Sequence, residues 1–182
     1  MLTEIIISGF GGQGVLFAGK CLAYSAMLKG AELSWLPSYG PEMRGGTANC
    51  SVCLSDEPIG SPLVTEPDIL IAMNDPSVER FIGSVKPGGK VFIDSSMAET
   101  EITRSDISVY RLPASQTAED NGLSGMGNII LLGKVLAECA GKLCGIDEKA
   151  VLEAFGKIIP AKKAALIEKN TAALLLGEKA PA

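Results

Sequence analysis

Short apolar runs alternate along the chain with segments in which apolar residues recur at helical spacing. The first run, residues 4–8, is β-branched and almost continuous, as in a strand buried on both faces of a parallel sheet. Glycines follow at once, and from residue 13 to 27 apolar side chains recur every three or four positions. The opening of the chain therefore predicts a strand, a glycine-rich loop and a helix.

The same alternation continues through the chain. It predicts further strands at 31–35, 47–54, 68–73, 90–94 and 108–112, and helices at 75–85, 127–140, 147–158 and 161–176. Strands that alternate with helices favour an α/β fold with a Rossmann-like, open, mostly parallel sheet, helices on both faces and a helical C-terminal segment. We expect one domain over residues 1–182, with an α/β core at 1–133 and a helical part at 134–182.

Composition narrows the chemistry that this fold can carry. The chain has 16 Lys and Arg against 21 Asp and Glu, a net charge of −5, and no histidine. The missing histidine removes Ser/His and Cys/His dyads and imidazole metal ligands. The acidic balance argues against a nucleic-acid partner. No apolar stretch reaches the ~20 residues of a membrane span, and the first residues do not resemble a signal peptide, so we expect no membrane contact and a cytoplasmic protein.

The five cysteines are odd in number and scattered, as expected for reduced thiols. Cys50 and Cys53 have C-x-x-C spacing but fall in the strand predicted at 47–54. An odd separation in a strand directs the two side chains to opposite faces, so a chelate is not expected there. We find neither a metal site nor a catalytic constellation in the sequence.

The strongest local motif is the glycine loop, residues 9–14, which reads Gly-Phe-Gly-Gly-Gln-Gly. It fits G-x-G-x-x-G between a strand and a helix, the context in which backbone amides and a helix N-terminus bind a diphosphate. The alternative is that the glycines only let the strand turn into the helix. An NAD site also needs an acid at the end of the second strand, where the chain has none, because Glu32 lies at its start. A dinucleotide dehydrogenase is therefore disfavoured, whereas another phosphorylated ligand is allowed.

A second loop, residues 37–46, follows the second strand and should lie at the same sheet edge, where ligands of open α/β sheets bind. Arg44, flanked by two glycines, could present its guanidinium to a phosphate or carboxylate; the alternative is an ion pair with Glu42 or with a partner subunit. Asn74 ends the next parallel strand, where it could line the crevice or cap the following helix. Asn128 precedes another helix, whose N-terminus could bind an anion, although a simple asparagine cap is the plainer interpretation there.

The two loops together closely resemble the gamma subunit of 2-oxoacid:ferredoxin (acceptor) oxidoreductases. The resemblance also includes the segments 56–62, 72–74 and 86–89, and it covers residues 4–133. It implies a subunit of a complex that oxidatively decarboxylates a 2-oxoacid with coenzyme A to acyl-CoA, CO₂ and reduced ferredoxin. Thiamine diphosphate, Mg and iron–sulfur clusters would then belong to the partner subunits. These are the alpha and beta subunits, with the presence of a delta subunit left open, and ferredoxin would bind the assembled complex.

By this resemblance no cofactor is bound tightly by this chain, and coenzyme A lies at its surface. The residues that become candidates for it are Gly9, Gly11, Gly12, Gln13, Gly14, Ser38, Tyr39, Arg44 and Asn74. Two alternatives stay open: a stand-alone Rossmann-like protein that binds a mononucleotide, and a purely structural subunit whose glycine loop is empty. The identity of the 2-oxoacid stays open too, with a preference for 2-oxoglutarate or 2-ketoisovalerate by resemblance.

Overall fold

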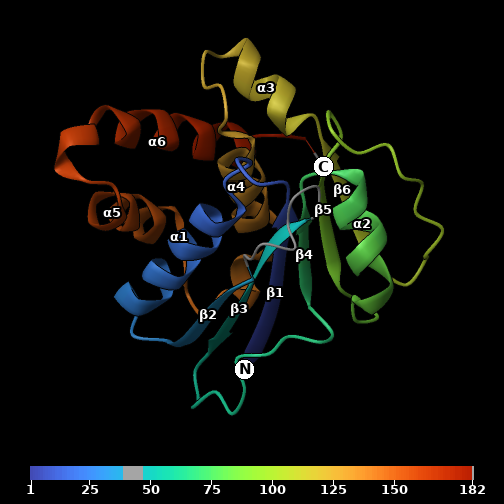
Figure 1. Cartoon of the computed structure of the whole chain (residues 1–182). Helices are drawn as coiled ribbons and strands as arrows, with labels where there is room; N and C mark the ends of the chain where they lie inside the picture. The colour runs from blue at the N-terminus through green and yellow to red at the C-terminus, as the bar shows by residue number, and fades with distance from the viewer. Residues whose placement is uncertain (39–46, 182) are drawn as a thin grey trace.

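The computed structural model describes residues 1–38 and 47–181, whose strands form one six-stranded sheet (Figure 1). The spatial order of the strands is β2-β3-β1-β4-β5-β6. Their bounds are β1 Leu2–Gly9, β2 Glu32–Ser38, β3 Ala48–Ser55, β4 Ile69–Ala72, β5 Lys90–Asp94 and β6 Ser108–Leu112.

Strand direction in this sheet is parallel on one side of β1 and antiparallel on the other. Strands β1, β4, β5 and β6 pair in parallel, whereas β3 is antiparallel to both of its neighbours, β1 and β2. The predicted mostly parallel α/β sheet is therefore confirmed. Because β3 lies between β1 and β2, those two strands run the same way and end at one edge, where Gly9 pairs with Ala48 and Ser38 with Asn49.

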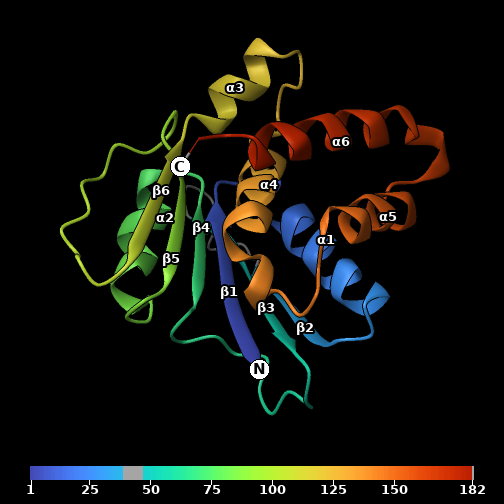
Figure 2. The same cartoon turned by 180° about the vertical axis from the view of Figure 1, so that it is seen from behind.

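Helices cover the two faces of the sheet unequally, as Figures 1 and 2 show. The helices are α1 Val15–Leu28, α2 Asp75–Phe81, α3 Ala114–Asp120, α4 Gly127–Cys139, α5 Glu148–Ile158 and α6 Ala165–Glu178. Side chains alternate along β1, so that Ile5 and Ile7 join the core under α1 and α4, whereas Ile6 packs with Val78 of α2. The near-continuous apolar run 4–8 thus has its expected cause, burial on both faces.

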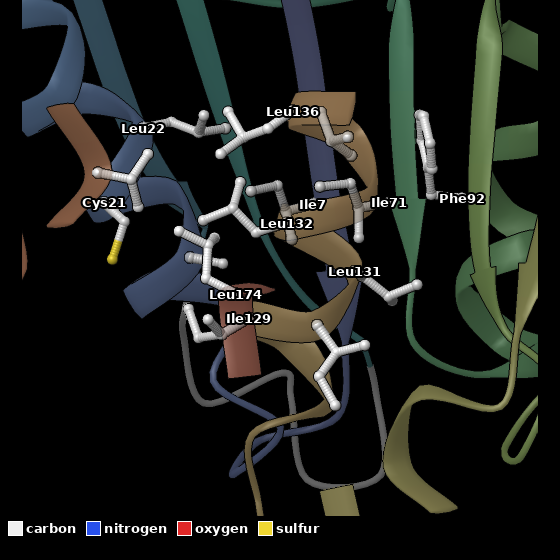
Figure 3. Close-up of a cluster of buried hydrophobic side chains, with 14 of the residues drawn as sticks. Ile7, Cys21, Leu22, Ile71, Phe92, Ile129, Leu131, Leu132, Leu136 and Leu174 are labelled. Carbon is white, nitrogen blue, oxygen red and sulfur yellow. The ribbon is translucent and has the colours of Figure 1, made fainter. Parts of the chain in front are cut away.

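The larger core lies between the sheet and the helices α1 and α4 (Figure 3). Ile7, Ile71 and Phe92 supply the sheet side, and Leu22 of α1 and Leu132 of α4 lie against them, all fully buried. Full burial of one such side chain contributes about 1.5–3 kcal/mol relative to exposure. This core fixes α1 and α4, and with them the loops at their N-termini.

Helices α4 and α6 cross at two glycines. A Cβ atom built on Gly177 would overlap the carbonyl oxygen of Ile130, and one built on Gly133 would overlap the carbonyl oxygen of Leu174. The two backbones therefore touch, which only glycine allows. Lys134 lies next to the crossing, 2% exposed, and donates to Ala180 O at 3.0 Å and to Glu138 Oε1 at 2.8 Å. The predicted helical C-terminal segment is thereby joined to the core.

Four elements differ from the sequence prediction. Helix α2 ends at Phe81 rather than 85, before a 3₁₀ turn at Ile82–Ser84. Helix α3 was not predicted. Only two of its residues, Ala114 and Ala118, are buried, and two small apolar side chains do not produce a recognisable helical pattern of hydrophobic residues. The last helix starts at Ala165 rather than 161, after a 3₁₀ turn that follows Pro160. Strand β2 extends beyond 35 to Ser38, since Pro37 lies on the outermost strand, where a proline breaks no ladder.

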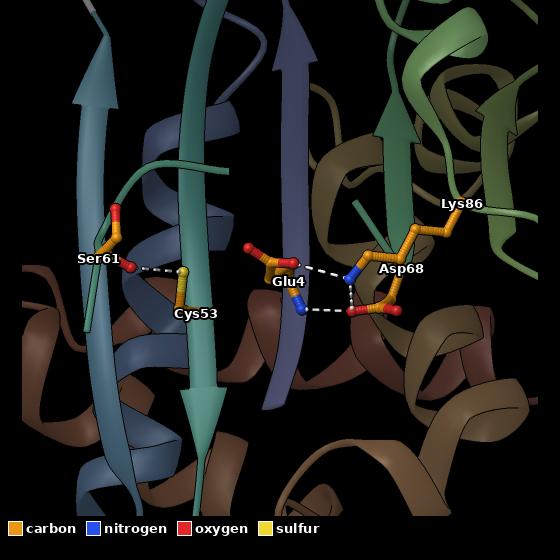
Figure 4. Close-up of polar contacts among 5 residues, drawn as sticks. All are labelled: Glu4, Cys53, Ser61, Asp68 and Lys86. Carbon is orange, nitrogen blue, oxygen red and sulfur yellow. Dashed lines mark hydrogen bonds and ion pairs between the residues drawn. The ribbon is translucent and has the colours of Figure 1, made fainter. Parts of the chain in front are cut away.

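An ion-pair cluster closes the opposite, amino-terminal end of β1 (Figure 4). Lys86 Nζ lies 2.7 Å from Glu4 Oε2 and 3.2 Å from Asp68 Oδ2. The backbone N–H of Glu4 donates to the same Asp68 oxygen at 2.8 Å. The cluster therefore ties β1 to the segment leading into β4, far from the edge at which the glycine loop lies.

Candidate functional site

The glycine loop, residues 9–14, joins the end of β1 to the start of α1. Gly12 and Gly14 have φ angles of +96° and +74°, which side chains rarely adopt. The backbone N–H of Gln13 donates to Phe10 O at 3.1 Å, so the loop closes as a tight turn. The predicted strand–loop–helix context is confirmed.

The side-chain amide of Gln13 fastens this turn to the end of β4. Its Oε1 accepts the backbone N–H of Phe10 at 2.6 Å and Nδ2 of Asn74 at 3.0 Å, and its Nε2 donates to Met73 O at 3.1 Å. Asn74 in turn caps α2, because its Oδ1 accepts the N–H of Ser77 at 2.9 Å. The capping interpretation of Asn74 is confirmed, and the structure brings two predicted site residues together as supports of the loop.

Two of the loop glycines are required by packing. A Cβ atom on Gly9 would lie 2.8 Å from Met73 Cβ, and one on Gly14 would lie 2.5 Å from Nδ2 of Asn128. That Nδ2 donates to Gly14 O at 2.9 Å. The predicted asparagine cap of α4 is wrong. The N-cap residue of α4 is Met126, which makes no side-chain capping hydrogen bond, and the amide of Asn128 donates to the glycine loop instead.

The other two glycines face outward. A Cβ atom on Gly11 or Gly12 would meet nothing within 4 Å, and both residues are exposed. Helix α1 has no side-chain cap and no acid in its first turn. A cavity of about 300 Å³ opens here, lined by Phe10, Gly11, Gly12, Gly14, Val15, Leu16, Phe17 and Ala48. The uncapped N-terminus therefore offers amide donors and the positive end of the helix dipole to an anion.

A second cavity, of about 360 Å³, adjoins the first and shares Gly14 and Phe17 with it. It lies between the N-terminal ends of α1 and α4 and the connection from α5 to α6. Most of its wall is apolar, from Phe17, Met126, Ile159 and Leu166, and Lys163 stands at its rim. Together the two cavities can hold an anionic group next to an apolar one.

The second predicted loop is only partly within the described residues. Ser38 ends β2 and is exposed at the edge where β1 ends. Strand β3 separates it from β1, so the two strand ends lie roughly 10 Å apart. Tyr39 and Arg44 fall among residues 39–46, outside the described residues.

The cysteine side chains do not converge. Cys50 Sγ lies 3.5 Å from Val15 O on the α1 side of the sheet, whereas Cys53 Sγ lies 4.0 Å from Ser61 O on the other side (Figure 4). The opposite-face prediction for the pair is confirmed. Among residues 1–38 and 47–181, no three side chains of Cys, Asp or Glu gather as metal ligands. The described residues therefore do not fit an iron–sulfur cluster. Nor does any helix in these ranges have the length and apolarity of a membrane span.

Arg80 places a positive charge at this edge that the sequence did not predict. Arg80 of α2 donates from Nη1 to Oγ1 of Thr47 at 3.1 Å. Thr47 directly precedes Ala48, the partner of Gly9 in the sheet. No motif points to Arg80, which in sequence is one charged position on an exposed helix face.

The chain matches known proteins over nearly its whole length. The family model described as pyruvate ferredoxin/flavodoxin oxidoreductase matches residues 4–180. The ketoisovalerate oxidoreductase subunit VorA of Methanothermobacter thermautotrophicus is 40% identical over 96% of this chain, which spans only 35% of that relative's length. The 2-oxoglutarate synthase subunit KorC of Methanothermobacter marburgensis is 37% identical, with 98% of this chain and 96% of the relative covered.

A solved structure shares the architecture. The gamma subunit of a keto/oxoacid ferredoxin oxidoreductase from Geobacter sulfurreducens superposes with a TM-score of 0.80 at 27% identity. The match covers 96% of this chain and 95% of that chain. The fold described above, including its helical C-terminal segment, is therefore that of a known subunit class.

Proposed function

Because the chain belongs to the pyruvate ferredoxin/flavodoxin oxidoreductase family, we propose that it is the gamma subunit of a multi-subunit 2-oxoacid:ferredoxin oxidoreductase. In this reaction a 2-oxoacid and coenzyme A give acyl-CoA and CO₂, and two electrons pass to ferredoxin. The near full-length match to KorC and to the Geobacter gamma subunit supports a separate subunit, whereas VorA carries the same unit within a longer chain.

The reactive cofactors belong to the partner subunits in this proposal. Thiamine diphosphate with Mg would supply the electron sink for decarboxylation of the 2-oxoacid, and iron–sulfur clusters would carry the electrons. The partners are the alpha and beta subunits, with a delta subunit where the complex has one. The cysteines of this chain stay thiols: burial raises the pKa of Cys50 to about 12 and that of Cys139 to about 11, so neither is a thiolate at neutral pH.

This chain contributes a coenzyme A site at the glycine loop and a surface for packing against its partners. The observation that carries the site is the N-terminus of α1, which has no side-chain cap and no acid in its first turn and stands beside the exposed Gly11 and Gly12. Backbone amides there suit the diphosphate of coenzyme A. The adjoining apolar cavity along Phe17 and Met126 suits an uncharged part of the same molecule.

Gly11 offers a sharp test. Its φ is not in the positive range and a Cβ atom there meets nothing within 4 Å, so Gly11→Ala should leave the fold unchanged and serves as the uncharged reference for this position. Gly11→Asp adds only a carboxylate in the same space. In the reconstituted complex, Gly11→Asp should raise the KM for coenzyme A about tenfold or more with little change in kcat, because like charges at the anion site repel. Equal KM values of the two variants for coenzyme A would show that coenzyme A does not bind at this loop.

Reconstitution tests the subunit role itself. The isolated chain should be inactive, and the complex should lose activity with both 2-oxoglutarate and 2-ketoisovalerate when the chain is left out. Full activity of the remaining subunits would overturn the role. Calorimetric titration of the isolated chain with mononucleotides and coenzyme A tests the alternative of a stand-alone nucleotide-binding protein. Tight binding of a free mononucleotide would support that alternative.

A further inference from the structure

Helix α2 is fastened over the end of β1 on the face opposite to α1. The hydroxyl of Ser8 donates to Ser77 Oγ at 2.9 Å, and both side chains are fully buried. Arg80 comes three residues after Ser77 and so lies on the same side of the helix. Its side chain therefore extends along the sheet rather than away from it.

The guanidinium of Arg80 is held at the edge that carries the glycine loop. Its Nη1 donates at 3.1 Å to the hydroxyl of Thr47, a residue only 6% exposed. Thr47 stands one residue before Ala48, which pairs with Gly9 at the end of β1. The guanidinium and the N-terminus of α1 thus flank the same strand end from its two sides.

Arg80 differs from the other described arginines in what its charge contacts. Arg104 donates to the carbonyls of Ile82 and Val85 and pairs with Asp106, and Arg111 donates to two carbonyls of the segment before β6. Arg80 is exposed and, within residues 1–38 and 47–181, has no carboxylate within 4.0 Å. Its remaining contact is the Phe81 ring, 5.1 Å from the guanidinium carbon, so most of its five N–H donors face no described acceptor.

We propose that Arg80, positioned by Thr47, binds the 3′-phosphate of coenzyme A. This inference rests on the proposed coenzyme A site at the glycine loop. Coenzyme A carries two kinds of phosphate: a diphosphate, which suits the amides at the N-terminus of α1, and a terminal monoester. The monoester has a charge near −2 and three terminal oxygens, which match the planar fork of an exposed arginine.

Dephospho-coenzyme A, which lacks only the 3′-phosphate, makes the test specific. In the reconstituted complex, Arg80→Met should raise the KM for coenzyme A about tenfold or more, with kcat unchanged. The KM for dephospho-coenzyme A should stay within about twofold of wild type, so the preference for coenzyme A disappears. Thr47→Val, which keeps the shape and removes the hydroxyl, should move the KM for coenzyme A in the same direction by about two- to fivefold and spare dephospho-coenzyme A.

Each other outcome separates this inference from the proposed function. If Arg80→Met raises the KM for both substrates equally, or for neither, while Gly11→Asp still raises the KM for coenzyme A, then Arg80 does not bind the 3′-phosphate although the site stands. If Gly11→Asp has no effect either, the proposed site falls with it. Thermal unfolding of Arg80→Met should match wild type, because the arginine is exposed and makes a single side-chain hydrogen bond among the described residues, to the hydroxyl of Thr47; a kinetic change that follows lost stability would also overturn the inference.

Discussion

The side-chain amide of Asn74 donates to Oε1 of Gln13 at 3.0 Å, although 61 residues separate them. Gln13 belongs to the glycine loop that leads into α1 and Asn74 is the N-cap of α2, so the hydrogen bond joins the starts of the helices on the two faces of the sheet at one edge. The amide oxygen of Gln13 also accepts the N–H of Phe10. The shape of the loop therefore depends on a side chain whose own contacts are internal.

Gln13→Ala should destabilise the chain by about 2 kcal/mol, because it leaves the N–H of Phe10 and the amide of Asn74 without their acceptor. Urea unfolding of the isolated chain measures the change. Gln116→Ala is the matched control, since Gln116 is exposed and, among the described residues, its side-chain amide bonds only to Asp120 one helical turn away. Equal stabilities of the two variants would contradict the supporting role of Gln13.

Gly14→Ala should cost about 2 kcal/mol or more, because the new Cβ atom combines a φ of +74° with a 2.5 Å approach to Asn128 Nδ2. Gly11→Ala, in the same loop but in open space, should change stability by less than about 0.5 kcal/mol. Denaturant titration of both variants measures the difference. A Gly14→Ala chain as stable as Gly11→Ala would mean that the contact with Asn128 is easily relieved.

Gly177→Ala should be the most destabilising alanine substitution among the helical glycines, by about 3 kcal/mol or more, because the backbones of α4 and α6 would have to separate. Gly156→Ala provides the contrast: it lies in α5, is exposed, and its Cβ atom meets nothing within 4 Å. Alanine there should raise stability by up to about 1 kcal/mol. The thermal unfolding temperature should fall for Gly177→Ala and rise for Gly156→Ala. Shifts of the same sign would refute the packing argument.

Lys86 makes stability depend on alkaline pH. Burial lowers its pKa, but the hydrogen bonds to Glu4 and Asp68 outweigh this and raise it above the ordinary 10.5. Because the pKa of Lys86 is higher in the folded chain than in the unfolded chain, the ion pairs contribute their full stability below pH 10.5. This contribution is lost as the pH rises through the folded-state pKa. Lys86→Met should therefore be about 1 kcal/mol less stable than wild type near neutral pH.

The difference in unfolding free energy between wild type and Lys86→Met should stay constant below the ordinary lysine pKa of 10.5 and shrink as the pH rises above it. Lys157→Met, at an exposed position with no carboxylate within 4.0 Å among the described residues, should show no such pH-dependent difference. A gap for Lys86→Met that stays constant as the pH rises above 10.5 would show that the cluster does not act through the charge of Lys86.

Cys144 should be the first cysteine alkylated by iodoacetamide in the native chain. It is partly exposed, whereas Cys21, Cys50, Cys53 and Cys139 are buried. Burial raises the thiol pKa of all five cysteines, so exposure decides the order. Mass spectrometry of the labelled peptides identifies the order of reaction. In guanidinium chloride all five should react at similar rates, and early labelling of Cys50 in the native chain would contradict its burial under α1.

Several features could be predicted from the sequence because local rules determine them. Burial on both faces makes Ile5 to Ile7 a continuous apolar run, and the glycines that follow mark the turn into α1. Period-two alternation was enough to place Cys50 and Cys53 on opposite faces. Helix α3 escaped prediction because two alanines are its whole buried stripe, so its pattern is that of a polar loop.

The candidate site divides in the same way. The sequence alone determined the glycine loop and its helix, and it offered Asn74 as one candidate cap of the next helix, since each of these depends on neighbours a few positions away. Only the tertiary structure decided that β3 inserts between β1 and β2, that Asn128 serves Gly14 rather than its own helix, and that Arg80 reaches Thr47. The two side-chain contacts join residues 33 and 114 positions apart, and they form only when the packing of α1, α2 and α4 on the sheet brings the residues together, which no local spacing in the sequence encodes.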